Sequence, residues 1–204
     1  MNRLSILIFL FALNSLNAQE NFDRTARAFL KTKTEQFKIS DTDVSTARLS
    51  DFHFDEKSKT HFVYLQQTHK GVDIFNAITA LAVKKDGQVF NSGVGFLPKL
   101  SKKTFRSVDK YSAMDALHIT LGHLNVPLPK NKIKFQKNRN NLYSLSLSAI
   151  AHNDIFAEKI YYAKEGVLIL SWRIEYDSKI SDKASSTIID AGNGSILKEI
   201  NQTL

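Results

Sequence analysis

The chain has 204 residues, of which 28 are Lys or Arg and 20 are Asp or Glu, so it carries a formal net charge of +8. Hydrophobic residues make up 43% of the sequence, which permits a proper core and excludes a wholly disordered chain. No cysteine is present, so a disulfide framework and a thiolate metal site are both excluded.

The N-terminus has the pattern of a secretory signal peptide. Met1-Asn2-Arg3 supplies a positive start, an apolar run extends from Leu4 to Leu13, and Ser15-Leu16-Asn17-Ala18 forms a small-residue exit. The pattern predicts cleavage after Ala18, so residues 1–18 are the expected signal peptide. The apolar run is shorter than the roughly 20 residues that span a bilayer, and no later stretch is apolar enough to do so. We therefore expect an exported protein without stable membrane insertion, in the periplasm, at the cell surface or outside the cell.

The first elements after the signal are a helix and two strands. Residues 21–37 predict an amphipathic helix, because apolar side chains recur at spacings of three and four with charges between them. Residues 40–43, Ser-Asp-Thr-Asp, predict a polar break, and residues 46–54 alternate like a strand. We expect this strand to pair with the next one, at residues 60–68.

Residues 60–97 are the centre of the first half and predict three strands. The breakers between them are His69-Lys70-Gly71 and Asp86-Gly87. A two-residue turn at Asp86-Gly87 would place Lys85 opposite Gln88 and Val83 opposite Phe90. This register predicts one buried face, made of Leu81, Val83, Phe90 and Val94. Residues 19–97 form the first expected domain.

A basic stretch and a second helix come next. Residues 98–108 are expected to be a basic connector with one proline. A helix is predicted for residues 109–124, with Asp109 as its cap and a buried stripe of Ala113, Leu117, Leu121 and Leu124. Within residues 130–154, the Ser-Leu-Ser-Leu-Ser run at 144–148 alternates only weakly. An edge strand and an ordered loop both remain open there.

Four strands are predicted for the last part of the chain, at residues 158–163, 167–177, 185–190 and 195–200. The second has the clearest alternation, because five apolar side chains fall on one face at period two. They are Leu168, Leu170, Trp172, Ile174 and Tyr176. Ala191-Gly192-Asn193-Gly194 predicts the turn of a closing hairpin between the last two strands. Residues 109–204 form the second expected domain.

The first half resembles the propeptide domain shared by fungalysin and thermolysin precursors, the FTP domain. The resemblance is carried by the run Val-Tyr-Leu-Gln-Gln-Thr-His-Lys-Gly-Val at 63–72, by Ile-Phe-Asn-Ala at 74–77 and by Lys-Asp-Gly-Gln-Val at 85–89. In that pattern a Gln ends a strand, a Gly follows, and then come a hydrophobic pair, an Asn or Gly, and an Ala. Asp73 departs from it, because the family usually has Pro there, which affects only the rigidity of the bend. The residues of these runs favour the fungalysin branch over the thermolysin branch.

The second half resembles the PepSY-like part of the same propeptides. There a strand carrying Trp-Arg is followed by a variable loop and an Asp-Ala-x-x-Gly turn, here Trp172-Arg173 and residues 190–194. The expected fold class is therefore α+β, with two small antiparallel sheets each packed with one helix. The two expected domains are FTP-like (19–97) and PepSY-like (109–204), joined by the connector at 98–108.

The sequence shows no constellation of residues for peptidase chemistry. A zinc peptidase of this kind needs two His four apart on a helix, with an intervening Glu as general base. The six histidines are His53, His61, His69, His118, His123 and His152. The helical pair His118 and His123 is five residues apart, which turns the rings roughly 140° from each other. We therefore expect no catalytic residue, no metal site and no cofactor. A longer precursor would be a zinc metalloendopeptidase.

The motif residues are interpreted as structural. A carboxylate pair of Glu175 and Asp190 is the catalytic alternative, but Asp190 is better explained as the residue that opens an Asx-turn. The expected structural residues are Gln67, Gly71, Asn76, Asp86, Gly87, Trp172, Asp190 and Gly194.

The resemblance implies a non-catalytic pro-region that assists folding of a zinc metallopeptidase domain and inhibits it. The chain would be either a truncated precursor acting in cis or a free-standing relative acting in trans. An exported binding module of the same fold without a peptidase partner is the alternative. The candidate residues for partner binding are Arg173, Glu175, Asp177, Ile196 and Lys198.

A polyanion binder is a third possibility, because basic stretches occur at residues 99–106 and 130–139. These stretches lack the interleaved aromatic residues of single-strand binders, which favours solvated loops and no nucleic-acid partner. The oligomeric state is left open.

Overall fold

A computed structural model describes residues 19–90, 94–127, 135–139, 141–181 and 183–203. The expected signal peptide, residues 1–18, lies outside the described residues. The chain divides into two compact units. The first comprises the chain up to Gly71 together with Asn76–Lys102, and the second comprises Val72–Phe75 and Lys103–Leu204. In the described residues, no helix is both long and apolar enough to cross a membrane.

The first unit begins with helices. Residues 19–31 are helical, a turn at residues 32 and 33 interrupts the helix, and α2 (Thr34–Phe37) follows. Lys38 ends α2 in the left-handed conformation, with φ 57°. The predicted polar break at 40–43 is wrong, because α3 (Asp41–Thr46) starts there. Ser40 and Asp43 form a capping box, in which the Ser40 side chain accepts the Asp43 N–H and the Asp43 carboxylate accepts the Ser40 N–H.

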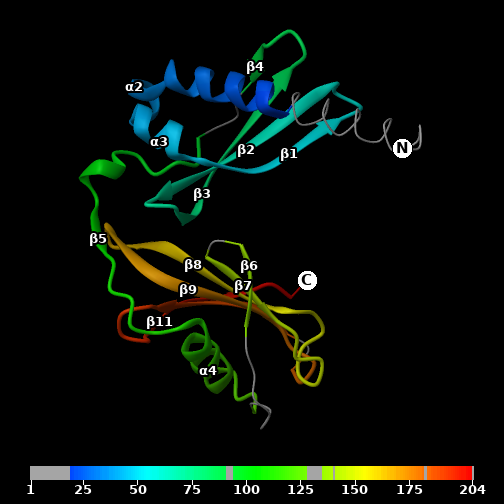
Figure 1. Cartoon of the computed structure of the whole chain (residues 1–204), viewed down its shortest axis with the longest axis vertical. Coiled ribbons are helices and arrows are strands. Elements are labelled where there is room, and N and C mark those ends of the chain that lie inside the picture. Colours follow the sequence, from blue (N-terminus) through cyan, green and yellow to red (C-terminus); the bar gives the residue numbers. More distant parts are fainter. Residues whose placement is uncertain (1–18, 91–93, 128–134, 140, 182, 204) are drawn as a thin grey trace, which may run out of the picture. The chain divides into compact units, whose positions relative to one another are not determined.

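These helices cover one face of four strands (Figure 1). The strands are β1 (Arg48–Asp55), β2 (Thr60–His69), β3 (Val72–Lys84) and β4 (Val89–Phe90). The core between the layers joins Ala26 and Leu30 of the first helix to Val63, Leu65 and Leu81 of the strands, all 0% exposed. The 3₁₀-helix η1 (Leu100–Lys102) closes this unit.

The predicted register of the β3–β4 hairpin is wrong by one residue. Val83 pairs with Val89, and Phe90 pairs with Ala82. The N–H of Lys84 donates to Gln88 O at 2.9 Å and the N–H of Gly87 donates to Lys84 O at 2.9 Å. The loop therefore has three residues, with Gly87 at φ 85°, rather than two. Because the side-chain period of a strand is two, Phe90 moves to the outer face, where it is 45% exposed.

The expected fold class of two small antiparallel sheets, each with one helix, is also wrong. The described strands form one eleven-stranded mixed sheet with the order β1-β2-β3-β8-β9-β10-β11 along its main path. The link is β3, which pairs in parallel with β8 at Asp73 and Ile74. Asn76, with φ 60°, interrupts the regular conformation of this 13-residue strand just beyond those pairs. Such a parallel pairing joins segments distant in sequence, so local alternation does not reveal it.

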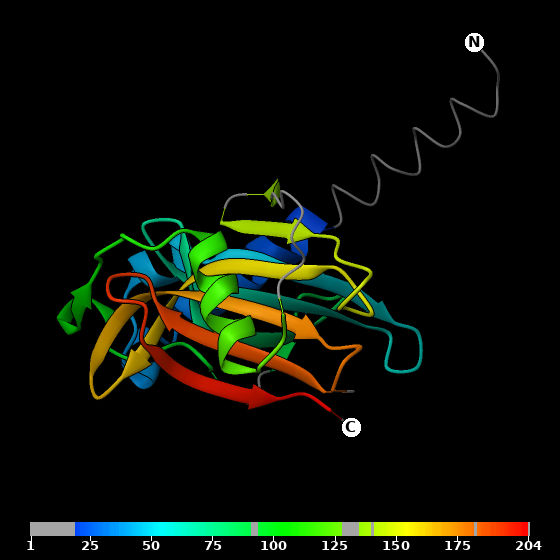
Figure 2. The same cartoon turned by 90° about the horizontal axis from the view of Figure 1, so that it is seen from below.

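The second unit contains the remaining strands and one helix. They are β5 (Thr104–Arg106), α4 (Ala113–His123), β6 (Gln136–Arg139), β7 (Leu142–Leu145), β8 (Ile155–Lys164), β9 (Val167–Asp177), β10 (Ala184–Asp190) and β11 (Ile196–Asn201). Strands β8 to β11 run antiparallel in sequence, and α4 lies across them (Figure 2). The four predicted C-terminal strands thus coincide with β8 to β11.

Two local predictions for this unit need correction. The cap of α4 is Ser112, which forms a capping box with Asp115; Asp109 instead pairs with Lys159. The expected connector is not only a loop, because β5 within it pairs in parallel with β9. Of the two alternatives for residues 144–148, the edge strand is wrong, because β7 ends at Leu145 and pairs with both β6 and β8, and residues 146–148 lie outside the strand.

Candidate functional site

Gln67 joins three segments of the first unit. Its side chain is 0% exposed, and its Oε1 accepts the N–H of Leu97 at 2.8 Å. Its Nε2 donates to Leu97 O at 3.3 Å and to Asp43 Oδ1 at 3.4 Å. The amide therefore satisfies the backbone of the segment after β4 and ties it to α3. In this position it cannot reach a partner protein, because it has no exposed surface.

The other motif residues of the first unit occupy turns or irregular backbone. Gly71 and Gly87 have φ of 76° and 85°, in the region that glycine tolerates best. Asp86 Oδ1 accepts the N–H of Gln88 at 3.0 Å, which closes the hairpin loop. Asn76 has φ 60° within β3 and is exposed. Gly71, Asp86 and Gly87 thus shape strand ends, whereas Asn76 forms an irregular point within β3.

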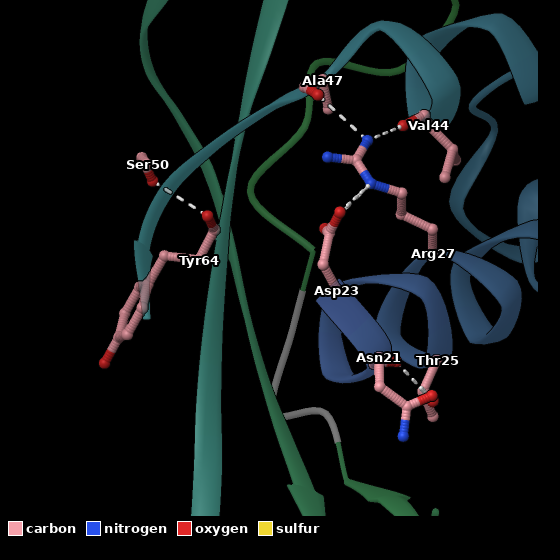
Figure 3. Close-up of polar contacts among 8 residues, drawn as sticks. All are labelled: Asn21, Asp23, Thr25, Arg27, Val44, Ala47, Ser50 and Tyr64. Atoms are coloured by element: carbon pink, nitrogen blue, oxygen red, sulfur yellow. Dashed lines mark hydrogen bonds and ion pairs between the residues drawn. The ribbon is translucent and has the colours of Figure 1, made fainter. Parts of the chain in front are cut away.

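A half-buried polar network that the sequence pattern does not reveal is centred on Arg27. Its Nε donates to the Asp23 carboxylate at 2.9 Å, and one of its terminal nitrogens donates to Val44 O at 2.7 Å and Ala47 O at 3.0 Å (Figure 3). Arg27 thus binds carbonyl groups at the C-terminal end of α3, where helix carbonyls lack partners. The Asp-x-x-x-Arg spacing was a visible signal for the ion pair, although not for the contact with α3.

In the second unit, Trp172 anchors the segment before α4. Its side chain is 3% exposed, and its indole N–H donates to Tyr111 O at 2.7 Å. Tyr143 contacts the indole edge-on with ring centroids 5.7 Å apart, and the Lys159 ammonium lies 4.6 Å from the indole centroid. Lys159 also donates to Asp109 Oδ2 at 2.5 Å. One tryptophan therefore links β9 to β7, β8 and the chain leading into α4.

The turn at residues 190–194 also contacts the segment that precedes α4. Asp190, 2% exposed, accepts the N–H of Gly192 at 2.7 Å, which is an Asx-turn, and its second oxygen accepts a hydrogen bond from Arg106. Ala191 O accepts the N–H groups of Lys110 at 2.8 Å and Tyr111 at 2.9 Å. The Trp-Arg strand and the Asp-Ala-x-x-Gly turn thus converge on residues 106–111.

A cavity opens beside this anchored segment. Its volume is about 590 Å³. Its lining comes entirely from the second unit, and consists of residues 109–114 together with Phe135, Tyr143, Lys159 and Trp172. The sequence pattern does not reveal it, because its walls come from five separate stretches of the chain.

The five candidate partner-binding residues do not form one cluster. Arg173 donates to Glu158 Oε2 at 2.6 Å and lies 3.3 Å from Glu175 Oε1, so these side chains are bound within the sheet. Asp177 accepts a hydrogen bond from Asn153 at 2.9 Å. Ile196 and Lys198 lie apart from them on β11, the last strand of the sheet order.

The alternative of a catalytic carboxylate pair does not form. Glu175 pairs with Ser186 across the β9–β10 ladder, whereas Asp190 pairs with Ser171. Four residues along a strand separate these positions by about 13 Å. Each carboxylate also has its own arginine, Arg173 for Glu175 and Arg106 for Asp190.

The resolved pKa shifts lie elsewhere. Burial lowers the pKa of His61, and burial together with the charge of Lys70 lowers the pKa of His69. Hydrogen bonds from Ser58 lower the pKa of Asp55, and hydrogen bonds from Ser112 lower that of Asp115. Within the described ranges, no three His, Cys, Asp or Glu side chains gather in a way that could hold a metal ion.

Comparisons with known proteins agree with the motif residues. A family model of the fungalysin/thermolysin propeptide motif matches residues 45–93. The chain is 32% identical over 155 residues to a probable extracellular metalloproteinase 4 of Arthroderma benhamiae, covering 72% of this chain and 23% of that protein. It is 27% identical over 178 residues to the extracellular metalloproteinase 4 of Arthroderma gypseum, covering 84% of this chain and 27% of that protein.

The chain thus spans about a quarter of the length of these relatives. Among solved structures, the Bacillus megaterium YpeB C-terminal domain is similar with a TM-score of 0.39 and 15% identity, over 90% of this chain and 64% of that one. The part of the chain that the family model matches is propeptide sequence. Residues 45–93 thus match the fungalysin/thermolysin propeptide motif, and the chain is homologous to the propeptide region of fungalysin-type extracellular metalloproteinases.

Proposed function

We propose that this chain is a pro-region that binds the catalytic domain of a fungalysin-like zinc metallopeptidase, assists its folding and inhibits it. The propeptide motif at residues 45–93 carries this proposal. The role needs a folded surface and no nucleophile, metal or cofactor of its own. It operates in cis within a longer precursor or in trans as a separate chain.

Polar contacts within the first unit support a scaffold role for it. Gln67 and Arg27 fix α3 against its neighbours, and both use their polar groups within the unit. Residues already engaged in this way stabilise the fold rather than contact a partner. The contact surface is therefore better sought in the second unit.

Strand β11 is the contact surface that we favour. It ends the strand order, so one edge of it has no further strand on the main path of the sheet. A sheet edge offers backbone N–H and C=O groups that can pair with an extended segment of another protein. Lys198 on this strand is exposed and Ile196 is half-buried, which provides a charged and an apolar side chain for specificity. Arg173, Glu175 and Asp177 lie on β9, which β10 separates from β11, and they stay secondary candidates for contact with the partner.

Export of the chain is part of the same proposal. The relatives are described as extracellular metalloproteinases, and the pattern of residues 1–18 is that of a signal peptide. A pro-region would have to accompany its peptidase to the same compartment.

Complex formation and refolding test the proposal. Purified residues 19–204 are mixed with a folded fungalysin-type catalytic domain from the same organism, and the mixture is separated by size exclusion. The same chain is added to the unfolded catalytic domain during dilution from denaturant. We expect a stable complex in the first assay and a higher yield of active peptidase in the second. Neither effect would be seen if the chain were a binding module without a peptidase partner.

A further inference from the structure

The cavity beside Trp172 lies outside the contact surface proposed on β11. Its volume is about 590 Å³ and it is widely open to solvent, so it can receive one side chain of a larger molecule rather than enclose a small one. None of the five candidate partner-binding residues lines it. Its walls are held in place, because Trp172 bonds to Tyr111 and the turn at 190–194 fixes the segment before α4.

The apolar part of the cavity is aromatic. Trp172, Tyr143 and Phe135 line it, and Met114 of α4 adds a flexible thioether. The edge-on contact of Tyr143 with Trp172 fixes the orientation of both rings. A planar or branched apolar side chain of about the size of phenylalanine would find aromatic faces and edges here.

The charge at the rim is positive. Lys159 and Lys110 line the cavity together with one acid, Asp109. Asp109 is engaged by Lys159, whereas Lys110 is exposed and pairs with no carboxylate in the described part of the chain. The rim therefore complements one negative charge.

We propose that this cavity docks a segment of a partner protein in which an aromatic side chain is followed directly by an acidic residue. The aromatic side chain packs against Trp172 and Tyr143, and the carboxylate pairs with Lys110. The identification of the occupant as a protein segment rests on the proposed function, while the chemistry rests on the cavity itself.

Trp172 allows a direct binding test, because it is the only tryptophan of the chain. The probe is the capped peptide acetyl-Leu-Phe-Glu-Leu-amide, titrated into residues 19–204 while indole fluorescence is recorded. We expect a saturable change. Replacing Phe by Ala in the probe should weaken binding roughly tenfold. Replacing Glu by Gln should weaken it roughly threefold, with the difference vanishing at high salt.

Variants of the chain test whether the peptide binds in the cavity. Lys110→Gln should reduce the affinity for the Glu probe to that for the Gln probe and leave the Gln probe unaffected. Tyr143→Ala should weaken both probes. Lys198→Gln, an exposed lysine on β11, is the matched control and should change neither. Circular dichroism of each variant establishes that it is folded.

Three results would overturn the proposal. One is the absence of a saturable change at millimolar probe with the folded parent chain. Another is a response that persists unchanged in both Lys110→Gln and Tyr143→Ala. The third is a fluorescence change that depends on the concentration of the chain alone, which would assign the cavity to a second copy. The assay contains no peptidase, so it fails or succeeds separately from complex formation.

Discussion

The indole N–H of Trp172 donates a 2.7 Å hydrogen bond to the backbone oxygen of Tyr111, 61 residues earlier in the chain. The partner is a main-chain carbonyl, so the bond specifies the path of the chain before α4 rather than the identity of residue 111. The Asx-turn at Asp190 fixes the same path through Ala191 O. The two motif elements of the second half therefore share one structural task.

Substitution of Trp172 by Phe should destabilise the chain by about 1 to 3 kcal/mol, because the buried Tyr111 carbonyl loses its indole donor while much of the aromatic packing remains. Tyr143→Phe removes only a phenol hydroxyl and should cost less. Urea unfolding followed by far-UV circular dichroism compares the two. Equal midpoints for Trp172→Phe and the parent would show that the hydrogen bond is dispensable.

Gly194→Ala should be more costly than Gly166→Ala. Both glycines have positive φ, 74° and 81°, so both substitutions carry a similar backbone penalty of about 1 kcal/mol. A Cβ on Gly194 would also lie 2.8 Å from Tyr111 Cε1, whereas a Cβ on Gly166 would meet nothing within 4 Å. The difference between the two unfolding free energies isolates the clash with Tyr111. A Gly194→Ala variant as stable as Gly166→Ala would mean that Tyr111 moves aside freely.

The corrected hairpin register makes a prediction of its own. Val83 is 0% exposed and Phe90 is 45% exposed. Val83→Ala should therefore cost about 2 kcal/mol through the lost burial and the cavity that remains. Phe90→Ala should cost less than about 1 kcal/mol, mainly through the lost contact with the Lys84 ammonium, which lies 4.6 Å from the ring centroid. A lower denaturant midpoint for Phe90→Ala than for Val83→Ala would instead support the register with a two-residue turn.

Local chemistry was readable from the sequence where a few adjacent residues determine it. The closing hairpin and the Asx-turn at Asp190 depend on the run Asp-Ala-Gly-Asn-Gly, and the alternation of residues 167–177 matches β9. The capping boxes at Ser40 and Ser112 were equally visible as Ser-x-x-Asp, but the sequence analysis interpreted Ser40 as a break and placed the cap at Asp109.

Strand pairings between segments distant in the chain could not be predicted from the sequence. Nothing in the sequence around Asp73 indicates that it pairs with Ile160, and nothing around Phe105 indicates that it pairs with Leu168. The same applies to the cavity, whose lysines and aromatic residues come together only in the folded chain. The loop at Asp86 is one residue longer than predicted. Because successive side chains of a strand point to opposite faces, this one residue places Phe90 on the outer face instead of the buried one.

Stability should fall on acidification through His61. Burial lowers its pKa from the ordinary value of 6.5, its Nδ1 is buried without a hydrogen-bond partner, and its ring stacks on Phe22 with centroids 3.7 Å apart. Protonation therefore favours the unfolded chain. This contribution to stability is complete above the unfolded pKa of about 6.5 and is lost as the pH falls toward the lower, folded pKa.

His61→Phe should reduce the loss of thermal stability between about pH 7.5 and about pH 5, because the titrating ring is gone while the aromatic stack remains. His69, whose pKa is also lowered, keeps part of the dependence. Phe54→Leu alters a neighbour of His61 without removing the titrating group, and should keep the full dependence. An unchanged pH profile in His61→Phe would exclude this histidine as its source.

Titration of a mature peptidase with the chain tests the proposed inhibition in trans. Residues 19–204, shown to be folded by circular dichroism, are titrated against a mature fungalysin-type peptidase from the same organism while cleavage of a fluorogenic peptide is followed. The chain alone serves as the control for contaminating proteolysis. We expect a saturable, concentration-dependent loss of cleavage and no cleavage by the chain itself. Full peptidase activity at a micromolar excess of the folded chain would contradict it.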